Sequence, residues 1–458
     1  MSPRGRWAVV CATVPLIWLG VPAVAASANG IVSPQAQGHA DGDSATTSLK
    51  HVVVMAQEGH TFDNYLSGRP GAAGRPSGVC VPAAGRSGTP CVHPYPINGS
   101  PHAMLRATSA TQRTSVNGGR MDGFVRAQAV HDADGRVAMG YYPTKQLPIL
   151  NGLADRGVLF DHWFAAVPGG SIANDLFGVA ARSPGDVSAV PSGGWTHTPL
   201  IFDRLQAARV TWRVYVEDYD PRTTIRTATS TQQRAEGQVA RVPLLSTKRW
   251  LGQPLHGHVV PLARYYQDLA HGRLPQVAFV VTTRHTERPP QNPATGQSLV
   301  RGVVNALLGS SAWAGSAFFL TYTDPGGWYD HVPPVAAPGG AARGLRVPTV
   351  MISPFARAGT VDHTVVDSAG ILKVIEQNWS LPPLTDRDAD APSLLSTLTF
   401  HAASRTPSLV GVASTESPTH QPDRSVLYAG YLLALLCGVA GVPATLWWAR
   451  PRTRQESP

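Results

Sequence analysis

The sequence predicts a three-layer α/β/α domain with a mainly parallel sheet, spanning residues 48–402. Short runs rich in β-branched and aromatic residues alternate along the chain with segments of helical period. Strands that are apolar throughout are typical of parallel sheets covered by helices on both faces. With 43% hydrophobic and 15% charged residues the chain is too apolar for wholesale disorder, and its 45 Gly and 40 Pro exclude a helical bundle.

The expected elements alternate in chain order. Strands are expected at residues 51–56, 211–216, 277–281, 317–322 and 347–352. Helices are expected at residues 146–156, 201–208, 262–270, 298–308 and 368–379. Functional residues of such sheets gather at the carboxyl ends of the strands, so the residues that follow each strand are the first candidates.

The N-terminal residues are not expected to belong to the fold. Arg4 and Arg6 precede an apolar run and a series of small residues, which is typical of a secretory signal peptide at residues 1–28. An uncleaved membrane anchor is the alternative. Residues 29–47 are small and polar, and we expect them to form a disordered lead-in.

A second apolar segment predicts a membrane anchor. Residues 426–449 carry no charge and are long enough to cross a bilayer as a helix, and Arg450, Arg452 and Arg454 follow at once. The positive-inside rule then places the tail, 450–458, in the cytoplasm and the domain on the extracytoplasmic side of the cell membrane. Residues 403–425, rich in Ser, Thr and Pro, are expected to link the two; a soluble core helix is the alternative to the membrane span.

Charge and cysteine content narrow the partners and the compartment. The formal net charge is +9, but the positive charges are scattered and nearly all Arg, so no nucleic-acid partner is expected. Cys11 and Cys437 lie in the predicted signal and membrane segments. The remaining pair, Cys80 and Cys91, is expected to form a disulfide across a Gly/Pro/Ser loop in an exported domain; two free thiols are the alternative.

Polar residues stand at three positions suited to chemistry. Glu58 follows the first expected strand and Asp324 the fourth, where carboxylates can bind a cation. Ser171 follows a Pro-Gly-Gly turn and begins a helix-compatible stretch, where a hydroxyl activated by a metal becomes a nucleophile toward phosphorus. The structural alternatives are a solvated turn after Glu58, a turn hydrogen-bonded by Asp324, and an ordinary helix N-cap at Ser171.

Seven motifs then occur in the order in which one family has them. They are residues 51–63 (HVVVMAQEGHTFD), 117–124 (NGGRMDGF), 139–142 (MGYY), 167–169 (VPG), 274–277 (LPQV), 326–334 (GGWYDHVPP) and 346–354 (RVPTVMISP). From about residue 50 to residue 400 the chain thus resembles the bacterial phosphoesterase family of phospholipases C and acid phosphatases, which have an alkaline-phosphatase-like fold.

The resemblance implies a metal-dependent phosphoesterase that works through a phosphoseryl intermediate. Glu58, Asp324 and Ser171 would bind a divalent metal ion of unknown identity, and Ser171 would be the nucleophile. His102 would be the second catalytic residue and would assist the leaving oxygen. The residues expected to contact the phosphoester are Asn174, Arg288 and His331.

Three positions depart from the family pattern. Gly59 stands where the family has Asn, Thr323 replaces the first of two adjacent acidic residues, and Arg288 replaces a His. Thr323 is a weaker partner for a hard cation, and Arg288 can bind phosphate but cannot exchange protons near neutral pH. Two functions therefore stay open: an exported, membrane-anchored phosphoesterase acting on a phospholipid or small phosphomonoester, or a catalytically degraded relative that binds a phosphate-bearing or cell-envelope ligand without turnover.

Overall fold

The fold is given by a computed structural model of the chain. The structure describes residues 45–83, 91–100, 105–129, 135–196, 198–253, 255, 257–400 and 408–411. The predicted signal peptide, most of the lead-in and linker, the predicted membrane segment and the tail lie outside these residues. Within the part of the chain that is described, no helix is both long and apolar enough to cross a membrane.

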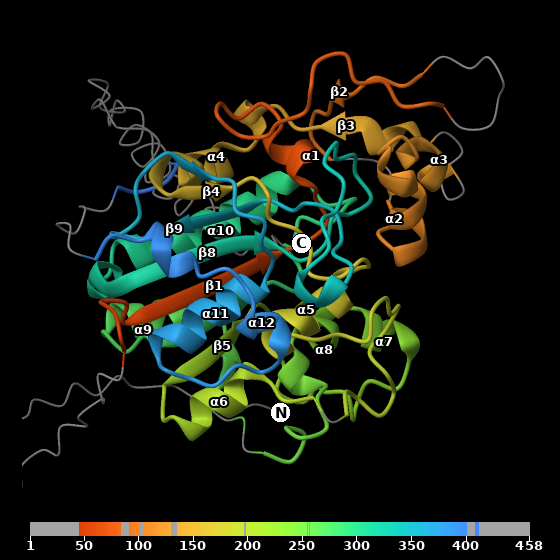
Figure 1. Ribbon diagram of the computed structural model, residues 1–458. Helices are drawn as coiled ribbons and strands as arrows, with labels where there is room; N and C mark the ends of the chain where they lie inside the picture. The colour runs from red at the N-terminus through yellow and green to blue at the C-terminus, as the bar shows by residue number, and fades with distance from the viewer. Residues whose placement is uncertain are drawn as a thin grey trace, which may run out of the picture. The chain divides into compact units, whose positions relative to one another are not determined.

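The centre of the fold is an eight-stranded sheet in the order β10-β4-β9-β8-β1-β7-β5-β6 (Figure 1). All neighbouring strands run parallel except that β9 is antiparallel to both β8 and β4. A separate parallel pair joins β2 and β3. The described strands are β1 (His51–Gln57), β2 (Tyr95–Pro96), β3 (Gly140–Tyr141), β4 (Val158–Phe160), β5 (Trp212–Val216), β6 (Val259–Pro261), β7 (Val277–Val281), β8 (Ser316–Tyr322), β9 (Thr349–Ile352) and β10 (Thr360–Asp362).

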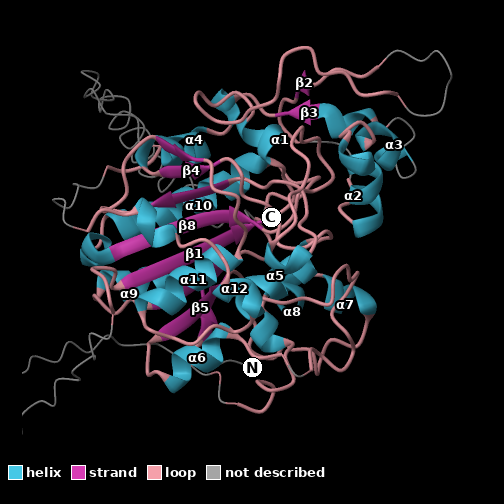
Figure 2. Ribbon diagram, in the orientation of Figure 1, coloured by secondary structure: helices cyan, strands magenta, loops and turns pink. Residues whose placement is uncertain are grey.

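Helices cover the two faces of the sheet (Figure 2). Helix α10 contacts α4 and α9 in one group, whereas α5 contacts α6 and α11 in the other, and α11 also contacts α12. The described helices are α1 (Phe62–Leu66), α2 (Ser109–Val116), α3 (Phe124–Ala129), α4 (Pro148–Arg156), α5 (Ser171–Ala180), α6 (Ile201–Ala207), α7 (Thr231–Ala235), α8 (Gly237–Arg241), α9 (Ala263–Ala270), α10 (Pro293–Leu308), α11 (Ala369–Asn378) and α12 (Asp386–Ala389).

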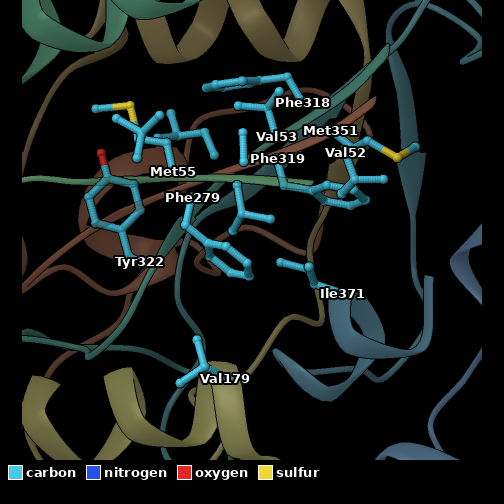
Figure 3. Close-up of a cluster of buried hydrophobic side chains, with 14 of the residues drawn as sticks. Val52, Val53, Met55, Val179, Phe279, Phe318, Phe319, Tyr322, Met351 and Ile371 are labelled. Atoms are coloured by element: carbon cyan, nitrogen blue, oxygen red, sulfur yellow. The ribbon is translucent and has the colours of Figure 1, made fainter. Parts of the chain in front are cut away.

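The core explains why the central strands are apolar at every position. All seven residues of β8 are buried, and so are the four of β9. Figure 3 shows side chains of the central strands packed together, with Val179 of α5 and Ile371 of α11 approaching from one face. Because both faces of the sheet are covered, alternation of polar and apolar residues is lost.

The predicted α/β fold with a mainly parallel sheet is confirmed. Each of the five expected strands and five expected helices is present, with ends that shift by a few residues. Helix α10 begins earlier than expected, because Asn292 caps it and Pro293 occupies its first turn. The sequence did not indicate β4, β6 and β10, which have three residues each and therefore no measurable period.

The predicted disulfide is confirmed: Cys80 and Cys91 are bonded to each other, with their Cα atoms 5.4 Å apart. The neighbouring residues Val81 and Val92 pair as an antiparallel bridge. The disulfide thus closes the base of a loop whose residues 84–90 lie outside the described part of the chain.

A buried carboxyl on α11 predicts a pH-dependent stability. Burial raises the pKa of Glu376 to about 9, and the charge of the nearby Asp388 adds to this shift. A pKa raised by folding makes the folded state lose stability as the pH rises from about 4 toward 9. Glu376→Gln, which never ionises, should therefore reduce the loss of unfolding free energy between pH 6 and pH 8.5 by about 1–3 kcal/mol. Urea unfolding at the two pH values measures this, with the exposed Glu236→Gln as the control; equal pH dependence in wild type and Glu376→Gln would refute it.

Candidate functional site

Two adjacent strand ends bring the predicted carboxylates together. Strands β1 and β8 are parallel neighbours whose last residues, Gln57 and Tyr322, are in register. Glu58 follows directly after β1, and Asp324 lies two residues beyond β8. The backbone fixes the two turns to each other, since the N–H groups of Gly59 and His60 both donate to the carbonyl oxygen of Asp324, each at 3.1 Å.

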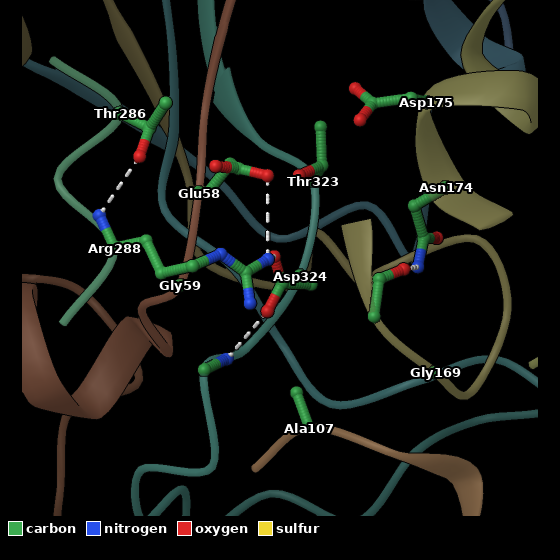
Figure 4. Close-up of polar contacts among 12 residues, drawn as sticks. Glu58, Gly59, Ala107, Gly169, Asn174, Asp175, Thr286, Arg288, Thr323 and Asp324 are labelled. Carbon is green, nitrogen blue, oxygen red and sulfur yellow. Dashed lines mark hydrogen bonds and ion pairs between the residues drawn. The ribbon is translucent and has the colours of Figure 1, made fainter. Parts of the chain in front are cut away.

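The side chain of Arg288 bridges the two carboxylates (Figure 4). Its Nη2 atom lies 2.7 Å from Oδ2 of Asp324 and 3.3 Å from Oε1 of Glu58. Asp324 is fully buried and Glu58 is nearly so. The loop after β7 that carries Arg288 is thereby joined to the ends of β1 and β8.

A second arginine, which the sequence did not indicate, completes the charge cluster. Nη1 of Arg241, at the end of α8, lies 2.9 Å from Oε1 of Glu58 and 2.9 Å from Oδ2 of Asp175. Its other nitrogens donate to backbone carbonyl oxygens, Nη2 to Ala56 at 3.0 Å and Nε to Thr282 at 3.2 Å. This guanidinium is therefore held on all sides, and its side chain is only 4% exposed.

Ser171 is the first residue of α5, and Gly170 is the N-cap. The serine is therefore not the cap that its position suggested as the structural alternative. Its hydroxyl lies close enough to Glu58 to help lower the pKa of that carboxyl. The hydroxyl thus lies at the N-terminal end of the α5 dipole and beside the two bridged carboxylates.

The carboxylates of the cluster differ in their affinity for a proton. Burial alone would raise the pKa of Glu58, but Arg241, Arg288 and the Ser171 hydroxyl outweigh it and lower that pKa to about 2. Burial raises the pKa of Asp175 to about 8 against the opposing charge of Arg241. Burial also raises the pKa of Asp324, although Arg288 opposes the shift. Glu58 is therefore the firmly ionised acid of the site.

A groove at the surface exposes part of this cluster. Four residues of the cluster line it, Glu58, Ser171, Arg241 and Arg288, together with residues of the loops around 105–108 and 186–188 and of helices α7 and α8. Its walls hold many polar side chains. The groove brings a nucleophilic hydroxyl and two guanidinium groups to one surface, which is an arrangement able to receive an anionic phosphoryl group.

Of the other predicted site residues, only Arg288 lines the groove. The side-chain amide of Asn174 donates to the carbonyl oxygens of Val167 and Gly170 and accepts from the N–H of Val167, so it holds the turn before Ser171. His331 is placed in a different cluster. His102 lies outside the described residues, and its role stays a prediction.

The cluster that contains His331 is a structural one. Arg346 is fully buried and forms ion pairs with Asp63 at 3.0 Å and with Asp330 at 2.9 Å. Nδ1 of His331 lies 2.7 Å from Oδ2 of Asp63. These pairs tie the start of α1 to the loop after β8. His331 is not among the residues that line the groove, and its contact with a substrate stays a prediction.

The backbone conformation and close contacts at position 59 favour glycine. Its φ angle is +81°, and a Cβ there would lie 3.1 Å from Cα of Arg288 and 3.2 Å from Cδ of Pro289. The Asn that the family pattern expects would have to displace the segment that carries Arg288. The departures at Gly59 and Arg288 are therefore coupled in space.

The donor set around Glu58 and Asp324 does not fit the divalent cation that the resemblance implies. Both carboxylates already contact a guanidinium group, and Thr323 directs its hydroxyl toward the carbonyl oxygen of Gln57. A metal ion bound there would face two permanent positive charges at short range. The serine and the carboxylates are present, but the positive charge of the site comes from the protein itself.

Groups of acidic and histidine side chains that could bind a metal do occur elsewhere in the described residues. One contains Asp161, His162 and His363; a second contains Asp63, Asp330 and His331, where Arg346 already neutralises both acids. In the first group both histidines contact the buried carboxylate of Asp161 through Nδ1. That contact satisfies the carboxylate without an ion.

Comparison with known proteins assigns the class. The model of the Phosphoesterase family matches residues 49–382, and the chain belongs to that family.

The chain is also similar in sequence to several phospholipases C. The chain is 25% identical over 427 residues to phospholipase C B of Mycobacterium tuberculosis, covering 78% of each chain. It is 27% identical over 375 residues to non-specific phospholipase C6 of Arabidopsis thaliana, covering 74% of this chain and 67% of the relative. It is 24% identical over 396 residues to a non-hemolytic phospholipase C of Pseudomonas aeruginosa, where it spans only 54% of the relative's length and 73% of its own.

Among solved structures, the chain is 10% identical to an alkaline phosphatase superfamily protein from Vibrio parahaemolyticus, with a TM-score of 0.36. The match covers 76% of this chain and 72% of the Vibrio chain. The assignment of the fold rests on the chain's own sheet and helices.

Proposed function

We propose that the chain hydrolyses phosphoester bonds in the groove, with Ser171 as the nucleophile. The observation that carries this proposal is the position of the Ser171 hydroxyl beside the ionised Glu58, at a helix N-terminus and in a groove that two arginines also line. Membership in the Phosphoesterase family supports it.

The proposed reaction has two steps. Oγ of Ser171 forms a bond to phosphorus while the bond from phosphorus to the leaving oxygen breaks, and water then hydrolyses the phosphoserine. The serine proton passes to Glu58, the carboxylate beside the hydroxyl, and the leaving oxygen takes a proton from His102 as the sequence predicts. Because phosphoryl transfer passes through a loose transition state, orientation and charge stabilisation matter more than a strong base.

The substrate that we propose is a phosphodiester of the phospholipid type, because the named relatives are phospholipases C. A phosphomonoester remains the alternative of the same chemistry. The resemblance also implies a divalent ion as cofactor, with Glu58, Asp324 and Ser171 as its ligands. The proposed reaction does not use this ion, because both carboxylates are ion-paired to arginine.

A specific observation favours a second function, a phosphate-binding protein without turnover. Arg288 forms ion pairs with Glu58 and Asp324, the two carboxylates that the family pattern would use for catalysis. It also replaces a residue able to exchange protons. In this alternative the groove would hold a phosphate-bearing or cell-envelope ligand.

Turnover distinguishes the two functions. The wild-type chain should hydrolyse bis(p-nitrophenyl) phosphate faster than p-nitrophenyl phosphate and should release phosphocholine from phosphatidylcholine vesicles. Assays with and without EDTA, and with added Mg²⁺ or Mn²⁺, cover both states of metal supply. Rates at the buffer background for all substrates under all these conditions would contradict hydrolysis and leave the binding function.

For the location we propose export and a single membrane span. The support is in the sequence: the N-terminal pattern at residues 1–28, the uncharged stretch at 426–449 and the arginines that follow it. A domain anchored on the extracytoplasmic side would be removed by protease added to intact spheroplasts, and its full protection there would contradict the proposal.

A further inference from the structure

One nitrogen atom contacts both carboxylates at the point where the resemblance implies a metal ion. This atom is Nη2 of Arg288, 2.7 Å from Asp324 and 3.3 Å from Glu58. A guanidinium group keeps its positive charge at all ordinary pH values, so it is a permanent cation between the two acids. It supplies the charge neutralisation that a metal would otherwise supply.

Arg241 extends the same arrangement. Its Nη1 lies 2.9 Å from Oε1 of Glu58, the same oxygen that Arg288 contacts, and also forms an ion pair with Asp175. Two guanidinium groups thus form ion pairs with three acidic side chains in a buried cluster. Removing the cations would leave several uncompensated carboxylates, which is why such a cluster does not also need a divalent ion.

Arg288 also keeps hydrogen-bonding capacity toward the groove. Its side chain is 34% exposed, and both of its ion pairs are made through Nη2. The N–H groups on Nε and Nη1 lie outside those two ion pairs. A guanidinium edge of this kind can donate two parallel hydrogen bonds to the oxygens of a phosphate group.

The loop that carries Arg288 is held in place. Oε2 of Glu217, directly after β5, accepts hydrogen bonds from the backbone N–H groups of residues 283–285 at 3.0–3.1 Å. The N–H of Glu58 donates to the carbonyl oxygen of Thr286 at 2.9 Å, which ties the loop to the end of β1. Arg288 is therefore positioned before any ligand arrives.

From this geometry we propose that Arg288, supported by Arg241, is the resident cation of the site and binds the phosphate group of the ligand without a divalent metal ion. The inference rests on the proposed function for the identity of the ligand. It adds that the site is metal-independent and that Arg288 is the residue which keeps metal ions out of the Glu58–Asp324 pair.

Phosphate binding tests the first half of the inference without any turnover. Isothermal titration calorimetry of the full chain with inorganic phosphate in EDTA should show one saturable site, whose Kd changes less than about 2-fold when Mn²⁺ replaces EDTA. Arg288→Gln should weaken this binding at least about 10-fold, because it removes charged hydrogen bonds to the anion. The matched control is Arg284→Gln in the same loop, since Arg284 is largely exposed and pairs with Asp218 outside the groove; its affinity should equal that of wild type.

Metal binding tests the second half. Titration with Mn²⁺ in the absence of phosphate should show one more binding site per chain in Arg288→Gln than in wild type, because Asp324 then loses its guanidinium partner and Glu58 keeps only Arg241. Any Mn²⁺ bound elsewhere is common to both proteins and cancels in the difference. Arg288→Lys keeps one positive charge and should bind no additional Mn²⁺.

Several outcomes would overturn the inference. They are phosphate binding by wild type that requires Mn²⁺, unchanged phosphate affinity in Arg288→Gln, and equal Mn²⁺ stoichiometry in wild type and Arg288→Gln. The comparison of phosphate binding in EDTA and in Mn²⁺ uses wild type alone. It therefore tests the inference even if Arg288→Gln fails to fold. Absence of hydrolysis together with metal-free phosphate binding would contradict the proposed function alone.

Discussion

Ser171→Ala should lower the rate of aryl phosphodiester hydrolysis by about 10³-fold or more, because it removes the only atom of that side chain that can bond to phosphorus. Folding should be little affected. Gly170, not Ser171, is the N-cap of α5, so the substitution removes no helix cap and should lower the free energy of unfolding by less than about 2 kcal/mol. The measurement is steady-state hydrolysis beside a thermal unfolding curve.

The control for this substitution is Ser188→Ala. Ser188 is an exposed serine that lines the same groove, so the chemical change is the same but the site is different. Ser188→Ala should keep wild-type turnover within about 3-fold. If Ser171→Ala kept wild-type turnover instead, Ser171 would not be the nucleophile and the reaction proposed above would be wrong.

Arg241→Gln should produce the largest loss of stability among substitutions in the site. It removes the buried cation that Glu58 and Asp175 share and that also donates to two backbone carbonyl oxygens. Breaking a buried ion pair by removing one partner costs about 3–5 kcal/mol, since the remaining charge stays buried. Urea unfolding of the variant and of wild type gives this difference directly.

A surface pair provides the comparison for Arg241. Arg249 is 68% exposed and forms an ion pair with Asp203, so Arg249→Gln should change the unfolding free energy by less than about 1 kcal/mol. Asp175→Asn added to Arg241→Gln should recover part of the loss, because it replaces one of the two buried acidic side chains that have then lost Arg241. A cost for Arg241→Gln as small as that for Arg249→Gln would contradict the charge cluster described here.

Local pattern was sufficient to predict the central strands and the acids that follow them. Glu58 and Asp324 come directly after long apolar runs, and parallel neighbours necessarily bring such positions to the same edge. Ser171 was found in the same way, through the Gly-rich turn before a helix. One further residue carried a signal that could have been used: Asp175 stands four positions after Ser171, which on a helix places both on one face.

The rest of the site depends on contacts between distant segments. Arg241 ends a five-residue helix without any motif, and only the tertiary fold brings it to Glu58. His331 lies within a motif, yet its contacts with Asp63 and the buried Arg346 join separate segments of the chain and depend on the tertiary fold. The left-handed backbone at Gly59 is likewise set by its approach to the Arg288 loop.

The proposed reaction requires a covalent bond between Ser171 and phosphorus. The direct measurement is mass spectrometry of the wild-type chain after rapid acid quench during hydrolysis of an aryl phosphoester, in EDTA. We expect a peptide that contains Ser171 and carries the added phosphoryl group, with no such addition in Ser171→Ala. Steady hydrolysis by wild type with an unmodified Ser171 at every quench time, or a phosphoryl group on another residue, would contradict it.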